Sequence, residues 1–402
     1  MSVTAAAGFL AAGVACGLKT TGKRDLAIVQ NRGPLKNVAS VFTSNRCKAN
    51  PVLWSQQVMA DGIADAIVLN SGGANCYTGA RGFQTTHATA EAVAERLDIS
   101  AGDVLVCSTG LIGEQLDLDK LKTGVWDAGL AILTGGATSE QAGLDAAHAI
   151  MTTDSVPKLS VRTVAATAAA TASAATNVAY TIGGMAKGAG MLAPGLATML
   201  VVITTDAMLS SEQLDVALRQ ATRVTFDRLD SDGCMSTNDT VTLMASGASG
   251  HEPGIEDFTL ELTALCKDLA LQLQADAEGS SHDIAITVTG AISEDEAVDV
   301  ARTVARSNLF KAAMFGNDPN WGRVLAAVGT TQATFDPYNV DVAFNGVKLC
   351  IAGEPGESRT LVDLSPRAVD VVIDIKAGPA SATIWTNDLT HDYVHENSAY
   401  AS

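Results

Sequence analysis

The stretch with the most chemical information is a glycine-rich segment, GGMAKGAGMLAPGLATMLVVITTD, at residues 183–206. A threonine hydroxyl is a weak nucleophile unless a base lies beside it, and a threonine that begins a chain can use its own α-amino group as that base. The reference pKa of an α-amino group is about 7.7–8.0, which suits a general base near neutral pH. Cleavage of the Ala197–Thr198 bond would create such a nucleophile at the start of an apolar strand, 199–204.

A plainer interpretation of Thr198 stays open on the residues alone. A β-branched threonine is an ordinary residue at the start of a buried strand, and the glycines before it are ordinary in a loop. Composition and spacing favour this plainer interpretation over the nucleophile.

Two other patterns fall short of a site. GLKTTGKR at 17–24 has the glycine and lysine spacing of a phosphate-binding loop, but Arg24 stands where Ser or Thr would hold magnesium, and no apolar strand precedes it. His391 and His395 could share one helical face as metal ligands. They lie in a polar tail, which favours solvated or hydrogen-bonded side chains, so we expect no metal site.

The charge balance excludes some classes of partner. The 402 residues include 26 Lys and Arg against 44 Asp and Glu, which gives a formal net charge of -18. Nucleic-acid binding needs basic stripes that contact phosphates, and the chain has none. An anionic substrate would therefore need a specific local cation.

Cysteine usage and the first apolar run bear on the compartment. The seven cysteines are widely spaced and form no CxxC pair, which predicts free thiols in a reducing compartment such as the cytoplasm. The run Ala5–Leu18 has the length of a signal peptide, but no basic residue precedes it, and it is too short to span a membrane. We expect it to form core or active-site structure, and we expect no membrane partner.

The elements that must position these residues alternate in blocks. Strands and helices with hairpin-like spacing predict an α+β fold with layered sheets rather than a regular βαβ array. The Ala/Thr-rich stretch 164–176 is low in complexity, and we expect a mobile surface insertion there. The expected strands are 25–30, 66–70, 103–110, 199–204, 240–246 and 283–290, and the expected helices are 86–97, 117–133, 139–150, 211–229 and 255–279.

A family resemblance covers nearly the whole chain. GGMAKGAGMLAPGLATML resembles the self-processing site of the ornithine acetyltransferase family of arginine biosynthesis. Further segments resemble signatures of the same family: GFLAAGVACGLK, NSGGANCYTG at 70–79, CSTGLIG at 107–113, IMTTD at 150–154, LDSDGCMSTNDT at 229–240, GNDPNWGRVLAAVG at 316–329 and the final DLTHDYVHENSAYAS.

The resemblance implies roles for single residues. Thr198 matches the nucleophile, and Ala197–Thr198 matches the processing bond. Thr109 and Gly110 match the oxyanion-hole pair, where losing one donor typically costs ~3 kcal/mol. The positions matching substrate contacts are Thr152, Lys187, Thr198, Glu278, Asn397 and Ser402.

For Lys187 and Glu278, charge also suggests a role. Lys187 would supply the cation that the acidic chain otherwise lacks, and Glu278 could pair with the side-chain ammonium of ornithine. As plain alternatives, Lys187 is a solvated surface lysine and Glu278 is a helix-terminal surface acid. Asn397 and Ser402 would lie in a frayed tail.

The resemblance also implies a fold and a reaction. The fold is an Ntn-hydrolase-like αββα core of the type found in DmpA aminopeptidases. The reaction is ping-pong transfer of an acetyl group from N2-acetylornithine to glutamate, with no metal or organic cofactor; acetyl-CoA as an additional donor stays open. An α piece, 1–197, and a β piece, 198–402, would stay together as one intertwined unit, commonly as an α2β2 assembly in the cytoplasm.

Two rival functions remain. An acyl-threonine ester that admits water would give an amidohydrolase or aminopeptidase on the same scaffold. A chain that never cleaves itself would be a binding protein without enzymatic activity.

Overall fold

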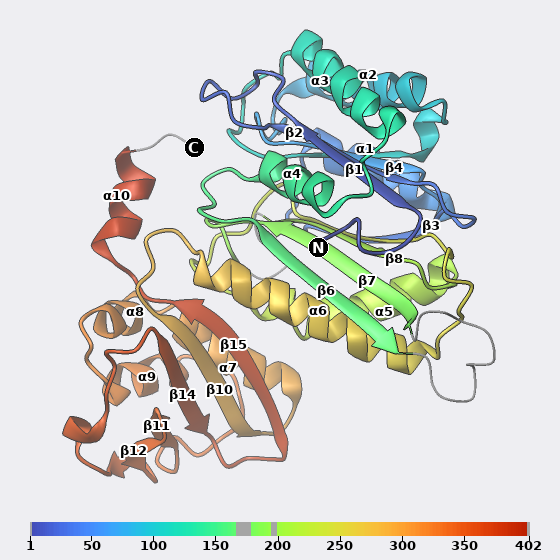
Figure 1. The fold of residues 1–402 in the computed structure, drawn as a ribbon. Coiled ribbons are helices and arrows are strands. Elements are labelled where there is room, and N and C mark those ends of the chain that lie inside the picture. Colours follow the sequence, from blue (N-terminus) through green and yellow to red (C-terminus); the bar gives the residue numbers. More distant parts are fainter. Residues whose placement is uncertain (1, 166–177, 194–198, 400–402) are drawn as a thin grey trace.

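Two stacked sheets form the centre of the molecule (Figure 1). The computed structural model describes residues 2–165, 178–193 and 199–399. The first sheet has four strands in the order β1-β2-β4-β5, with β4 and β5 parallel and the other neighbours antiparallel. Its strands are β1 (Phe9–Val14), β2 (Leu26–Asn31), β4 (Ala66–Asn70) and β5 (Val104–Ser108).

The second sheet has five strands in the order β3-β9-β8-β7-β6. The pair β8 and β9 is parallel, and the other neighbours are antiparallel. The two strands that follow position 198, β9 and β8, lie between β3 on one side and β7 and β6 on the other, so the two halves of the chain are interleaved. The strands are β3 (Asn37–Phe42), β6 (Lys158–Ala165), β7 (Val178–Lys187), β8 (Leu200–Thr205) and β9 (Thr240–Ala245).

Helices cover the outer face of each sheet, which gives four layers. Apolar side chains of α2 and α3 form one core with the first sheet, and those of α5 and α6 form another with the second sheet. A third core lies between the two sheets and includes small residues of α4. The helices are α1 (Asn50–Val58), α2 (Gly79–Leu97), α3 (Leu118–Thr134), α4 (Glu140–Ile150), α5 (Ser211–Arg223) and α6 (Ile255–Ala275).

Local sequence explains where these elements lie. All six residues of β8, LVVITT, are buried, as expected for a strand covered on both faces. Ser210 and Gln213 form a reciprocal capping box at the start of α5. Ser139 caps α4 by accepting a hydrogen bond from the Ala142 amide.

A third sheet follows near the C-terminus, with strand order β13-β12-β11-β14-β10-β15 (Figure 1). It packs against α7, α8 and α9 around a core of its own. Its strands are β10 (Asp283–Ala291), β11 (Asp341–Phe344), β12 (Val347–Ile351), β13 (Glu354–Pro355), β14 (Ala368–Asp374) and β15 (Ala380–Asn387). The later helices are α7 (Glu294–Ala305), α8 (Asn308–Phe315), α9 (Trp321–Val328) and α10 (His391–Ala399).

The structure confirms the α+β class and the αββα core. The segment Ala5–Leu18 contributes β1, as core structure should. Helix α2 begins at Gly79, seven residues before the expected start at 86, and the expected polar tail is helical as α10. The first two residues of the stretch 164–176 belong to β6, and the rest lies outside the described residues.

Two expectations about the whole chain can also be compared with the structure. All seven cysteines are free, and four of them are buried. Among the residues described, no helix is both long enough and apolar enough to cross a membrane.

Candidate active site

Thr109 and Gly110 form a turn directly after β5. The Thr109 amide donates to the Asn70 carbonyl at the end of β4, at 3.0 Å, which ties the turn to the neighbouring strand. Gly110 has a φ of +129°, and a Cβ at this position would lie 2.9 Å from the Gly73 backbone. Only glycine fits here without strain, because a side chain would meet the Gly73 backbone and the positive φ disfavours other residues.

Lys187 is the last residue of β7 and pairs with Leu200 at the start of β8. Its side chain is buried, and its Nζ donates to Thr109 Oγ1 at 3.1 Å. Burial lowers the pKa of Lys187, while the nearby Asp154 carboxylate acts in the opposite direction. The structure thus brings together two of the residues expected in the site from strands in different sheets.

Asp154 links the end of β7 to the start of β6. Its Oδ1 accepts from the Gly188 amide at 2.6 Å and from Lys158 Nζ at 2.5 Å, and Lys158 also bonds to Asp276. Burial alone would raise the pKa of Asp154, but the charges of Lys187 and Lys158 outweigh it and bring the pKa to about 2. The carboxylate therefore remains ionised beside Lys187 at neutral pH.

Glu278 joins three separate segments. Its Oε1 accepts from Thr153 Oγ1 at 2.7 Å, and its Oε2 accepts from Asn397 Nδ2 on α10 at 3.1 Å. Its amide donates to the Ala189 carbonyl at 3.0 Å. A Cβ at Gly190 would lie only 2.5 Å from Glu278 Oε2, so a larger residue there would displace the carboxylate.

For Thr152 and Asn397, the structure differs from what the sequence suggests. Thr152 is exposed, and its amide donates to Asp154 Oδ2 at 2.9 Å, while the hydroxyl that contacts Glu278 belongs to Thr153. Asn397 is bonded to Glu278 and lies in a helix, so it is no frayed tail. Ala197, Thr198 and Ser402 lie outside the described residues.

The residue after Thr198 is described, and it is held on both sides. The Met199 amide donates to Asp239 Oδ1 at 3.1 Å, and the Met199 carbonyl accepts from the Thr240 amide at 3.1 Å. Asp239 is fully buried, and burial raises the pKa of its carboxyl well above the usual range. The strand that follows Thr198 therefore begins at a fixed point.

Asn238 connects this point to the Thr109 turn. Its Nδ2 donates to the carbonyls of Ser108 at 2.8 Å and of Ala74 at 2.6 Å, and the side chain is buried. One amide thus braces the end of β5 against the segment that leads into β9.

Sequence reasoning missed four polar residues of this region: Asp154, Lys158, Asn238 and Asp239. Asp154 ends the signature IMTTD, and Asn238-Asp239 lies within the signature at 229–240, so the motifs marked the right places. What the motifs do not state is which side chain points inward. A buried lysine such as Lys158 carries no local sequence signal at all.

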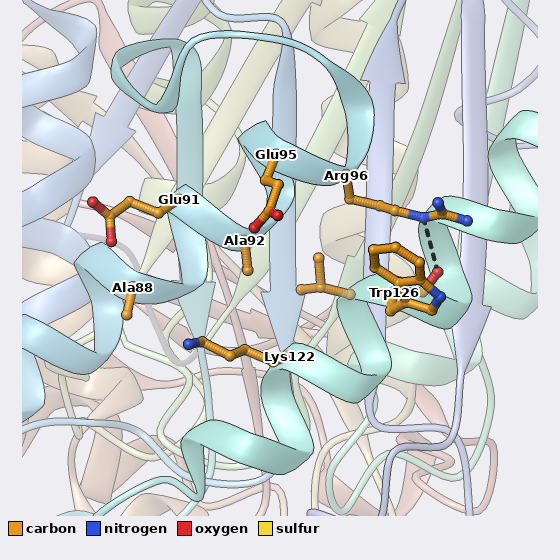
Figure 2. A pocket seen from close by; sticks show the side chains of 8 residues that line it. Ala88, Glu91, Ala92, Glu95, Arg96, Lys122 and Trp126 are labelled. Carbon is orange, nitrogen blue, oxygen red and sulfur yellow. Dashed lines mark hydrogen bonds between the residues drawn. The ribbon is translucent and has the colours of Figure 1, made fainter.

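A shallow groove elsewhere on the surface holds none of these residues. Figure 2 shows it between α2 and α3, on the outer face of the first sheet. Its volume is about 290 Å³, and Arg96 lies over the Trp126 ring, 4.1 Å from the centroid. The described residues contain no group of three or more His, Cys, Asp or Glu side chains that could hold a metal ion.

The αββα core and the strand-end site place the chain in the Ntn-hydrolase-like class of folds. The model of the ArgJ family matches residues 10–402. The arginine biosynthesis bifunctional protein ArgJ of Streptomyces coelicolor is 59% identical over 402 residues, all of both chains. Its counterpart from Thermobifida fusca is 58% identical over the same span. The chain belongs to the ArgJ family, and the expectation of an acyltransferase is confirmed at the level of enzyme class.

Solved structures also match. An ornithine acetyltransferase from Mycobacterium tuberculosis, complexed with ornithine, is 48% identical and has a TM-score of 0.43; the match covers 50% of this chain and 96% of that one. ArgJ from Bacillus halodurans is 34% identical with a TM-score of 0.47, and the match covers 49% of this chain and 97% of that one.

Proposed function

We propose that the protein is a glutamate N-acetyltransferase that moves the acetyl group of N2-acetylornithine to glutamate in arginine biosynthesis. The observation that carries the proposal is the buried hydrogen bond between Lys187 and Thr109, beside the strand that starts just after Thr198. A cation and a constrained Thr-Gly turn at this point suit a reaction that develops negative charge on an oxygen.

The first half-reaction forms an acetyl-enzyme. The α-amino group of Thr198 takes the proton of its own hydroxyl, and Oγ1 attacks the acetyl carbonyl carbon. The Thr109 hydroxyl and the Gly110 amide donate to the oxyanion. When the intermediate collapses, the amide C–N bond breaks, the proton passes to the leaving nitrogen, and ornithine departs.

The second half-reaction reverses these steps with another amine. The amino group of glutamate attacks the acetyl-threonine ester, the same two donors hold the oxyanion, and the ester C–O bond breaks. The proton lost by the attacking nitrogen returns to Thr198 Oγ1. One carboxylate subsite serves both amino acids, with Thr152, Asn397 and Ser402 as its contacts.

Glu278 provides selectivity for ornithine in this proposal. A carboxylate that already accepts from Thr153 and Asn397 is oriented, and it can still accept from a side-chain ammonium. Glutamate has no such group, so Glu278 should affect the donor more than the acceptor.

The nucleophile arises by self-cleavage between Ala197 and Thr198. This yields an α piece, 1–197, and a β piece, 198–402, which associate further as α2β2 in the cytoplasm. The interleaved strands of the second sheet support this part of the proposal, since β7 and β8 are hydrogen-bonded neighbours from opposite sides of the cut. The reaction needs no metal or organic cofactor.

A second activity is favoured by the word bifunctional in the names of the relatives. We propose acetyl-CoA as an additional donor, which would form the same acetyl-threonine and make acetylglutamate directly. Glutamate acetylation measured side by side with acetyl-CoA and with acetylornithine tests this extension. Product formation from acetylornithine alone would contradict the extension and leave the main proposal intact.

Intact mass and a transfer assay test the main proposal. The wild-type chain should appear as two pieces that divide at Thr198, and Thr198→Ala should remain one inactive chain. Normal processing of Thr198→Ala would show that the nucleophile is misassigned. Release of free acetate in place of acetylglutamate would favour the amidohydrolase alternative, and an uncleaved wild type without activity would favour a binding protein.

A further inference from the structure

Lys187 has a single hydrogen-bond partner among the described residues, and this partner is the hydroxyl of Thr109. Both side chains are almost fully buried, with exposed fractions of 1% and 2%. A lysine ammonium can only donate, so Thr109 Oγ1 must be the acceptor. The direction of this hydrogen bond follows from chemistry alone.

This direction fixes where the Thr109 proton can go. A hydroxyl has one proton and two lone pairs, and Lys187 occupies one lone pair. Thr109 Oγ1 donates to no residue within the described part of the chain, and its backbone amide is already used by Asn70. The hydroxyl proton is therefore a free donor beside the Gly110 amide, which also has no partner among the described residues.

A cationic donor also makes the hydroxyl a better donor. Charge-assisted hydrogen bonds are stronger than neutral ones, and linked hydrogen bonds polarise one another in a low-dielectric site. The Thr109 hydroxyl should hold an oxyanion more strongly with Lys187 behind it than it would alone.

We propose that Lys187 is a positioning residue of the oxyanion hole, which acts on the reaction through the Thr109 hydroxyl. The inference rests on the proposed function, because it concerns the same oxyanion. It differs from the expected role of Lys187 as a cation that binds a substrate carboxylate. A carboxylate contact would stabilise bound substrate and transition state alike, whereas a donor relay acts only where negative charge develops.

The charged groups around Lys187 affect the pH at which it loses its proton, and only the protonated amine can donate to Thr109 without also accepting from it. They come from the turn before β6, from β6, from the start of β9, from the segment after α6 and from the N-terminal loop: Asp154, Lys158, Asp239, Glu278 and Lys19. Burial lowers the pKa of Lys187, so the ammonium loses its proton at a lower pH than a solvated lysine. A neutral amine can accept the Thr109 proton, and the donor then turns away from the oxyanion.

A double-mutant cycle separates the two roles. The variants are Lys187→Met, Thr109→Val and the combination, and the readouts are kcat and KM for acetylornithine, expressed per cleaved chain from intact mass. We expect each single change to lower kcat by roughly 10²-fold. The combination should lose no more than about threefold beyond Thr109→Val, with KM changed by less than about threefold, because both act on one interaction.

Opposite results overturn the inference. A raised KM with unchanged kcat in Lys187→Met would identify a substrate contact, and kcat losses that multiply in the combination would show independent roles. Thr109→Ser, which keeps the hydroxyl, should restore most of kcat. Lys36→Met serves as a matched control, because Lys36 is a half-buried lysine that pairs with Asp65 at 3.1 Å, outside the proposed site.

The pH dependence gives a test that does not need a self-cleaving Lys187 variant. Wild-type kcat should fall at alkaline pH as Lys187 loses its proton, and Thr109→Val should lack this limb. An alkaline limb that persists unchanged in Thr109→Val, or its absence in the wild type, would refute the relay. A wild type with no transfer activity at any pH would instead refute the proposed function.

Discussion

Replacing Lys158 by methionine should destabilise the protein strongly. Lys158 is fully buried and forms ion pairs with Asp154 and Asp276. Breaking a buried ion pair by deleting one partner costs about 3–5 kcal/mol, because the remaining charge is left without compensation. After the deletion, Asp154 keeps Lys187 and the Gly188 amide, and Asp276 keeps the Ser155 amide, so we expect the lower part of that range.

We also expect Lys158→Met to lower the activity of the enzyme. Asp154 positions the Thr152 and Gly188 amides only while its carboxylate stays where Lys158 holds it. We therefore expect Lys158→Met to lower both the urea midpoint and the rate per cleaved chain. Urea unfolding, followed by fluorescence, and the transfer assay measure the two effects on the same preparation.

A second substitution tests the reasoning directly. If the loss of unfolding free energy comes from buried negative charge, Asp154→Asn in the Lys158→Met background should recover stability. One of the two carboxylates that lost Lys158 as a partner becomes neutral in this double variant. Lys376→Met is the matched control. Its partner Asp341 lies near the surface, where an ion pair is worth about 0–1 kcal/mol. The explanation by buried charge would be refuted if the double variant had a lower urea midpoint than Lys158→Met. It would also be refuted if Lys376→Met lowered the midpoint as much as Lys158→Met does.

The network also predicts a pH dependence, and its sign follows from Asp154. The folded-state pKa is lowered to about 2 from a reference value of 3.8, so the unfolded state binds the proton more readily. The ionised form then contributes roughly 2 kcal/mol above the reference pKa, and this contribution disappears as the pH falls towards the folded value. Asp154→Asn should flatten the acid limb of stability between these two values; an unchanged limb would contradict the assignment.

Three further substitutions should separate parts of the site. Gly110→Ala places a Cβ 2.9 Å from the Gly73 backbone at a φ of +129°, so kcat should fall by about 10²-fold as the amide donor moves; an active Gly110→Ala enzyme would place the oxyanion elsewhere. Gly190→Ala pushes a methyl group against Glu278, 2.5 Å from its oxygen, so steady-state kinetics should show a raised KM for acetylornithine and a smaller change for glutamate. Asn238→Ala leaves two buried carbonyls without a donor, which should cost about 1–3 kcal/mol in thermal unfolding and slow self-cleavage seen by intact mass; wild-type stability would show that the carbonyls are satisfied otherwise.

The sequence predicts the layers well because their signals are local. The apolar run after Thr198 and the capping serines before α4 and α5 determine strand and helix without help from distant residues. The same dependence on local signals explains why the sequence does not predict α10. Its residues, HDYVHENSA, are mostly polar and show no apolar face. What identifies it is a contact from Asn397 to Glu278, more than a hundred residues away.

Some residues of the site can also be found from local motifs, whereas others cannot. Thr109 and Lys187 are in recognisable motifs, and the structure shows that they touch. The roles of Asp154 and Lys158 depend on burial, and burial depends on how β6 and β7 pack against α6. No spacing rule reports that a lysine four residues after an aspartate will be fully enclosed.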